Sequence, residues 1–185
     1  NDPVSAEQTV RILLETAEGA MLAEVYPDRA PITAANFLQY VDAGYFENIS
    51  FYRVIRPDND ARNEHIRVIQ GGLGVQDDAR RLPPISHEPT NLTGLYHIDG
   101  ALSFGRWEPG TASSEFFIVL GDSPQLDFDG AVSGDGQGYA AFGRIISGMD
   151  VAHRINGGET GTTSDIDFMK DQGLLVPVRL RVKRA

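Results

Sequence analysis

Apolar and polar residues alternate with a period of two along much of the chain, which is the pattern of short β-strands with one buried face. Two such segments, residues 10–14 and 21–25, flank Glu18-Gly19 and predict an antiparallel hairpin. Further strands are predicted at residues 51–55, 68–70, 101–104, 116–120, 139–145 and 176–182. The pattern therefore predicts about eight short strands.

Two segments have the wider apolar spacing of an amphipathic helix. Pro31 suits the first turn of the first helix, and Gly44 marks its end. A second helix is predicted to follow Ser147, because Asp150 completes a start that resembles a capping box. Gly157 marks the end of that helix.

An even set of short antiparallel strands with two amphipathic helices predicts a mainly β fold, a closed eight-stranded antiparallel barrel whose open ends the two helices cover. The chain shows no repeat or linker, so residues 1–185 are expected to form one domain. No apolar run approaches the roughly 20 residues of a transmembrane helix. The basic residues near the C-terminus, Arg179, Arg181, Lys183 and Arg184, are interpreted as the solvated face of the last strand.

Two of the predicted strands contain one polar side chain among apolar ones. These are Arg53 in Phe-Tyr-Arg-Val-Ile and Gln70 in Val-Ile-Gln-Gly-Gly, and a buried polar group without a partner costs a few kcal/mol. The alternation places Arg53 on the same face as Phe51 and Ile55, while residues 116–120 are apolar on both faces. If the second face borders a groove, Arg53 and Phe117 line it. The alternatives are a surface arginine paired with an acidic residue and a phenylalanine packed in the core.

The order and spacing of several motifs resemble those of the cyclophilin-type peptidyl-prolyl cis-trans isomerases. The motifs are residues 51–55 (FYRVI), 68–72 (VIQGG), 100–104 (GALSF), 114–118 (SEFFI), 126–127 (LD) and 139–144 (YAAFGR), with residues 30–37 and 148–151 in the predicted helices. The resemblance extends from about residue 10 to residue 182, and Gly138-Tyr139 is similar to the bacterial branch. It implies the same barrel with a helix at each end. It also implies a rotamase that acts on X-Pro bonds of peptides and unfolded proteins and assists folding without a cofactor.

The resemblance assigns roles to individual residues. The catalytic residues would be Arg53, which donates to the nitrogen of the twisted bond, Gln70, which holds the arginine or the substrate backbone, and Tyr139, whose hydroxyl donates to a substrate carbonyl. The substrate-binding residues would be Val68, Phe117 and Leu126 around the prolyl ring and the backbone of Gly105, Arg106 and Trp107 along the groove.

Four differences from the family pattern concern the rim of that groove. They are the long polar stretch of residues 56–67 with Arg67 where an aromatic residue is common, Gln125 in place of a tryptophan, Glu115 in place of a glutamine, and Tyr52 in place of a histidine. Glu115 would add negative charge near Arg53. These differences keep a second interpretation open, a binding module that holds proline-containing segments with weak or no turnover.

Composition and the remaining motifs exclude other kinds of site. The chain has no cysteine, and its four histidines lack the spacing of metal ligands, so no metal is expected. Asp127 and Asp129 could form an acid–base pair, but their glycine-containing turn favours local hydrogen bonds.

A net charge of -10 argues against binding to nucleic acid or to an anionic membrane. We expect a monomer whose partners are proline-containing peptides and unfolded chains. The missing initiator Met and the bacterial resemblance favour export to the periplasm, with the cytoplasm as the alternative.

Overall fold

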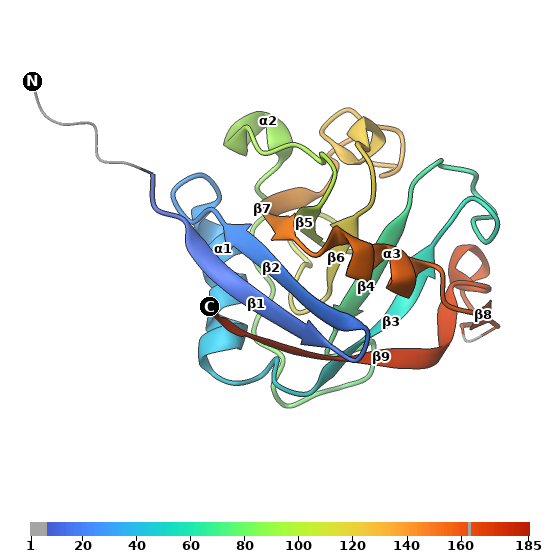
Figure 1. The fold of residues 1–185 in the computed structure, drawn as a ribbon. Helices are drawn as coiled ribbons and strands as arrows, with labels where there is room; N and C mark the ends of the chain where they lie inside the picture. Colours follow the sequence, from blue (N-terminus) through green and yellow to red (C-terminus); the bar gives the residue numbers. More distant parts are fainter. Residues whose placement is uncertain (1–6, 163) are drawn as a thin grey trace, which may run out of the picture.

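The computed structural model describes residues 7–162 and 164–185. Residues 1–6 and 163 lie outside this part. Eight strands form the predicted closed antiparallel barrel in the order β1-β2-β7-β5-β6-β4-β3-β9, and β1 pairs with β9 to close it (Figure 1). Their bounds are Val10–Thr16 (β1), Gly19–Val25 (β2), Ile49–Ile55 (β3), Val68–Gly72 (β4), Ala101–Phe104 (β5), Phe116–Val119 (β6), Ala140–Ser147 (β7) and Gly173–Arg184 (β9). The two-residue strand β8 (Thr160–Gly161) pairs with the beginning of β9.

The two predicted helices are α1 (Pro31–Asp42) and α3 (Met149–Asn156), which lie at opposite ends of the barrel (Figure 1). The predicted start of α3 is wrong in detail, because Ser147 is the last residue of β7 and the helix is capped by Gly148 without a side-chain hydrogen bond. A short helix α2 (Thr90–Thr93) and two 3-10 turns, η1 (Pro124–Leu126) and η2 (Asp167–Met169), were not predicted. Segments of three or four residues are too short to show helical periodicity. None of the described helices is long and apolar enough to cross a membrane.

Aromatic rings fill the interior of the barrel. Phe37 of α1 is fully buried, and its ring centroid lies 5.4 Å from that of Phe116 and 4.9 Å from that of Phe142. In β6, Phe116 and Ile118 belong to this interior core, whereas Phe117 belongs to a second apolar cluster outside the barrel. The two apolar faces predicted for this strand are therefore confirmed, and the outer cluster provides the floor of a groove.

A β-bulge in β3 changes the face that Arg53 occupies. Phe51 pairs with Gly71 of β4. The next pair joins Arg53 to Gln70, which leaves Tyr52 as an extra residue in β3. Phe51 packs in the interior core, whereas Tyr52 and Arg53 both line the groove outside the barrel. The prediction that Arg53 shares a face with Phe51 is wrong, because a bulge interrupts the period of two.

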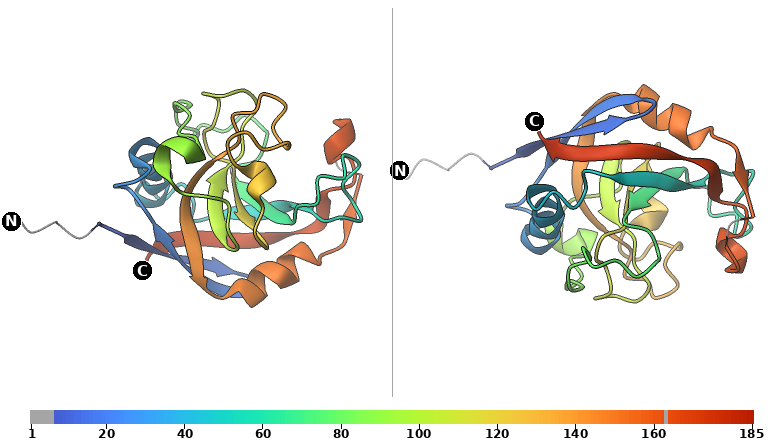
Figure 2. Two further views of the ribbon diagram at one scale, coloured as in Figure 1. Left: turned by 90° about the horizontal axis from the view of Figure 1, so that it is seen from above. Right: turned by 90° about the horizontal axis from the view of Figure 1, so that it is seen from below.

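Two long connections meet on one side of the barrel. The loop of residues 56–67, between β3 and β4, lies beside η2 in both orientations of Figure 2. The Arg62 guanidinium carbon is 4.3 Å from the centroid of the Phe168 ring, and Gln172 Nε2 donates to the carbonyl of Asn59 at 3.3 Å. These contacts fix the two segments to each other at the edge of the groove.

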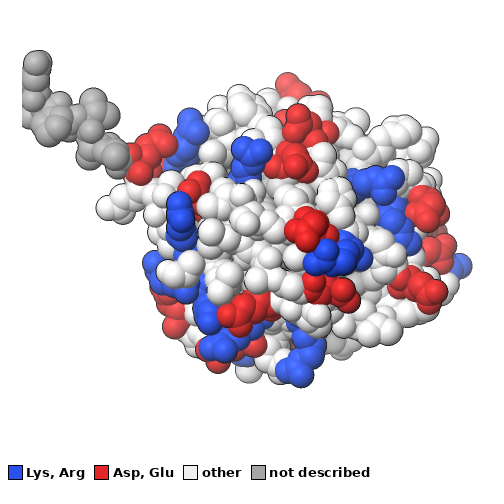
Figure 3. All heavy atoms as spheres, viewed as in Figure 1, with Lys and Arg blue, Asp and Glu red and all other residues white. Residues whose placement is uncertain are grey.

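Basic side chains near the C-terminus lie on the solvated side of β9, as the sequence predicts. The Arg184 guanidinium is 2.7 Å from Asp42, and Lys183 Nζ is 2.7 Å from Glu15. Figure 3 shows acidic and basic side chains interspersed over this face of the molecule. The charges of the strand are therefore balanced locally by carboxylates.

Candidate active site

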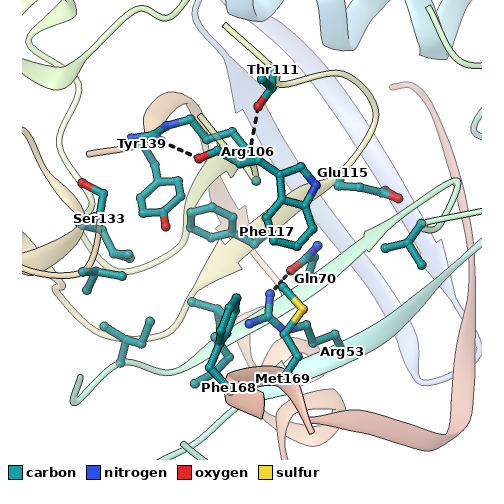
Figure 4. A pocket seen from close by; sticks show the side chains of 18 of the residues that line it. Arg53, Gln70, Arg106, Thr111, Glu115, Phe117, Ser133, Tyr139, Phe168 and Met169 are labelled. Atoms are coloured by element: carbon teal, nitrogen blue, oxygen red, sulfur yellow. Dashed lines mark hydrogen bonds between the residues drawn. The ribbon is translucent and has the colours of Figure 1, made fainter. Parts of the chain in front are cut away.

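A groove with a volume of about 550 Å³ lies on the outer face of the barrel (Figure 4). Its walls come from β3, β4 and β6, from the loop after β5, and from η2. All of the residues to which the resemblance assigns catalytic or substrate-binding roles line this groove. The fold thus brings together positions that are distant in the sequence. The catalytic and substrate-binding roles of these residues stay predictions.

Two neutral amide groups hold the Arg53 side chain. Its Nη1 donates to Gln70 Oε1 at 2.8 Å, while Nε and Nη2 donate to Gln172 Oε1 at 2.9 and 2.8 Å. Among the described residues, no carboxylate lies within ion-pair distance of Arg53, so the alternative of a surface arginine paired with an acid is wrong. Burial lowers the pKa of Arg53 to about 10, which leaves it cationic at neutral pH.

The Gln70 side chain joins Arg53 to Tyr52. Its Nε2 donates to the Tyr52 hydroxyl oxygen at 3.1 Å while its Oε1 accepts from Arg53. The next residue, Gly71, lies against the β3 backbone, and a Cβ there would be 2.8 Å from the Ser50 carbonyl oxygen. A larger residue would therefore push β4 away from the bulge that directs Arg53 into the groove.

Apolar side chains form the floor of the groove. Phe117, Val68 and Leu126, the predicted proline-binding residues, are buried together in the outer cluster. Tyr139 packs against this cluster, with its ring 5.6 Å from the Phe117 ring and at 85° to it. Ile66 belongs to the same cluster and was not predicted. The floor is therefore apolar, as a site for a prolyl ring requires.

A buried polar group supports the floor from behind. The His97 ring stacks on Phe117 at 6.1 Å, and its two nitrogens lie 2.7 Å from Asp127 Oδ1 and 2.9 Å from Ser103 Oγ. Asp127 also accepts from the His97 backbone N–H at 2.9 Å. Asp127 therefore has a structural role in a turn, as favoured over the acid–base alternative with Asp129. The sequence carried no signal for His97, whose partners come from other segments.

The loop after β5 forms the upper wall in Figure 4. Gly105 lies close to Gln70, since a Cβ on Gly105 would be 3.7 Å from Gln70 Nε2. The Arg106 side chain turns back, donating to both Asp135 oxygens and lying 5.0 Å from the centroid of the Tyr139 ring. Trp107 is 61% exposed and lines the groove. Side-chain contacts therefore hold this wall at Arg106, and Trp107 presents an exposed aromatic surface.

The unusual rim differs from the sequence expectation in two ways. Arg67 is exposed and does not line the groove, and Ile66 supplies the apolar wall instead. Gln125 donates from its Nε2 to the carbonyls of Glu64 and His65, at 3.2 and 3.0 Å. The residue in place of the family tryptophan thus anchors the loop of residues 56–67.

The Glu115 carboxyl group is buried beside the groove. No hydrogen bond of good geometry reaches either of its oxygens from the described part of the chain, and Arg81 Nη2 lies 3.9 Å from one of them. Burial raises the pKa of Glu115 from 4.5 to about 8, so most molecules carry a neutral carboxyl at pH 7. Gly72 has a φ of 145°, and a Cβ there would also clash with the Ser114 carbonyl oxygen, which explains the second glycine of the motif. Burial therefore opposes the negative charge near Arg53 that the sequence analysis expects from Glu115.

Three residues beside Arg53 were also missed from the sequence. Gln172, Phe168 and Met169 belong to the segment between β8 and β9, which the structure places beside Arg53. Gln172 precedes an apolar strand, but nothing in the sequence indicates that this strand pairs with β3 next to Arg53. Only the β3–β9 pairing brings it there.

Comparison with known proteins agrees with this arrangement. Residues 11–174 match the family model described as cyclophilin type peptidyl-prolyl cis-trans isomerase/CLD. The chain is 34% identical over 154 residues to peptidyl-prolyl cis-trans isomerase B of Escherichia coli, an alignment that covers 81% of this chain and 86% of that protein. It is 32% identical over 159 residues to peptidyl-prolyl cis-trans isomerase A of Dickeya dadantii, covering 82% and 74%. A solved cyclophilin type isomerase of Cryptosporidium parvum has the same fold, with a TM-score of 0.68, 21% identity, and coverage of 96% of this chain and 98% of that one.

Proposed function

Because the chain belongs to the cyclophilin-type peptidyl-prolyl cis-trans isomerase family, we propose that it catalyses rotation about X-Pro bonds in peptides and unfolded proteins, with Arg53 stabilising the twisted bond. The uncatalysed rotation has a barrier of about 18–20 kcal/mol, because twisting breaks the amide resonance. As the bond twists, the prolyl nitrogen gains a localised lone pair. A donor aimed at this nitrogen stabilises the transition state more than either planar isomer, which is the condition for catalysis.

The state of the Arg53 guanidinium is the observation that carries the proposal. A guanidinium has five N–H donors, of which three are used by Gln70 and Gln172. Two donors remain for a substrate, and the cation is not neutralised because both partners are uncharged amides. The group lies at the edge of an apolar floor, where an interaction with a developing lone pair is stronger than in water.

A peptide with an Ala-Pro bond tests the activity in a protease-coupled assay. We expect the rate of cis-to-trans conversion to increase in proportion to the concentration of the protein. The alternative function, a module that only holds proline segments, predicts calorimetric binding of the same peptide with no acceleration. The uncompensated charge on Arg53 supports turnover over binding alone, and binding without acceleration would refute the proposal.

Tyr139 is proposed to donate its hydroxyl to a substrate carbonyl. Burial raises the pKa of Tyr139, so the hydroxyl keeps its proton at neutral pH, and no hydrogen bond to another described residue occupies it. Tyr139→Phe is expected to lower kcat/KM about 2- to 10-fold, the effect of one neutral hydrogen bond of about 0.5–1.5 kcal/mol. Tyr96→Phe, at an exposed tyrosine outside the groove, is the matched control. Equal values of kcat/KM for the two variants would remove Tyr139 from the mechanism.

The partners, the oligomeric state and the location of the protein are also proposals. The protein is proposed to act as a monomer on proline-containing segments and to bind neither nucleic acid nor membranes, which its net charge of -10 and its interspersed surface charges support. Light scattering on the purified protein tests the monomer. Export to the periplasm stays a prediction that cell fractionation tests.

A further inference from the structure

We propose that Gln172 is a second positioning residue of the active site, which holds the Arg53 guanidinium in the orientation that catalysis requires. The inference rests on the proposed isomerase function and extends it to a segment that no motif marks. Gln172 Oε1 accepts two hydrogen bonds from one edge of the guanidinium, from Nε and from Nη2. Because two bonds to the same planar group fix its rotation as well as its position, Gln172 constrains Arg53 more than the single bond to Gln70 does.

The surroundings of Gln172 keep its own side chain in place. The residue is fully buried, and its Nε2 donates to the Asn59 carbonyl at 3.3 Å. Its backbone carbonyl accepts from the Val54 N–H at 2.9 Å, and its backbone N–H donates to the Met169 carbonyl at 3.1 Å. β3 and η2 therefore hold the backbone of Gln172, and the loop of residues 56–67 holds its side-chain amide, which is the support that a preorganised site needs.

The chemistry of the amide also matters. A carboxylate at this position would orient Arg53 equally well, but it would neutralise the cation and compete with the substrate for it. The neutral oxygen of Gln172 orients the guanidinium and leaves its charge available. The side chain of Gln70 on the other side of Arg53 has the same property.

Phe168 covers the same site from the side of η2. Its ring centroid is 6.0 Å from the Arg53 guanidinium carbon, and Arg62 lies over the same ring at 4.3 Å. Phe168 and Met169 both point toward the groove beside Arg53 (Figure 4). An apolar cover reduces the access of water to the guanidinium, which strengthens its interaction with the substrate.

The test compares kcat and KM for two Gln172 variants and a matched control. Gln172→Met keeps the size of the side chain and removes the acceptor, and we expect kcat to fall about 10- to 100-fold, the scale for a misplaced catalytic group, with KM within about twofold of the wild type. Gln172→Glu keeps the acceptor and adds a charge, and we expect kcat to fall as well. Lys170→Ala, on the exposed side of the same segment, should have wild-type kcat and KM.

A second readout separates positioning from general damage. The Arg53 Nε–H should exchange with solvent faster in Gln172→Met than in the wild type or in Lys170→Ala, measured by NMR, because it has lost its acceptor. Wild-type kcat in Gln172→Met, or a change confined to KM, would overturn the inference while leaving the proposed function intact. If Gln172→Met does not fold, wild-type kcat in Gln172→Leu, which also lacks the acceptor, overturns the inference equally. A wild-type protein without isomerase activity refutes the proposed function and the inference with it.

Discussion

Arg53→Ala is expected to slow isomerisation about 100- to 1000-fold, the usual effect of removing one preorganised donor from a transition state. The structure gives the reason, because Arg53 has two free N–H donors beside the apolar floor and Gln70 and Gln172 hold it in place. The loss should appear in kcat, since the interaction forms mainly when the prolyl nitrogen leaves the amide plane. The measurement is kcat in the protease-coupled assay on an Ala-Pro peptide.

Two further variants show whether this loss belongs to the chemistry. Arg53→Lys keeps a positive charge but cannot reproduce the planar fork that binds two amides and a substrate, so it should also be slow. Arg62→Ala removes a cation from the same groove without touching Gln70 or Gln172, and its loss should be much smaller. Circular dichroism should show that Arg53→Ala is folded. A folded Arg53→Ala protein with wild-type kcat would contradict the assignment.

Glu115→Gln is expected to make the protein more stable at alkaline pH and to flatten the dependence of its stability on pH. Burial raises the pKa of Glu115 from 4.5 to about 8. The folded protein therefore retains a proton that the unfolded chain releases above pH 4.5. The free energy of unfolding should fall by up to about 1.4 kcal/mol for each pH unit between these two values and then level off. This favourable contribution is complete below pH 4.5 and is lost as the pH rises through 8.

Urea unfolding at several pH values between 4.5 and 9 measures this effect. The buried glutamine carries no proton that can be lost, so the variant should lack the decline that Glu115 causes. Glu47→Gln, at a glutamate whose side chain is 61% exposed, is the control and should follow the wild type. Parallel stability curves for the wild type and Glu115→Gln would show that the buried carboxyl does not hold its proton.

Most of the fold could be predicted from local patterns. The eight barrel strands and both long helices were found because each contains several turns or alternations of apolar residues, enough to show a period. The misplaced start of α3 has a local cause, since Ser147 and Asp150 form a plausible cap but pairing with Leu22 of β2 keeps Ser147 in β7. The barrel architecture agreed with the family resemblance and did not depend on any single boundary.

The site could be predicted only in part. Arg53 and Phe117 stood out because one is polar in an apolar strand and the other occupies the second apolar face of its strand. The shared face proposed for Arg53 and Phe51 was wrong, since nothing in the local alternation reveals the bulge at Tyr52. Ile66 was missed because its polar neighbours conceal its burial in the outer cluster.

The pattern of apolar and polar residues along the chain decided which residues form strands and helices. It also decided which two strands carry a polar side chain that requires a partner. Contacts between distant segments decided the rest. They direct Arg53 outward and bring Gln172 to its guanidinium from 119 residues away. They also bury Glu115, which raises the pKa of its carboxyl group. The physical reason is that periodicity depends on neighbours in sequence, whereas orientation, desolvation and protonation depend on whatever the closed barrel places nearby.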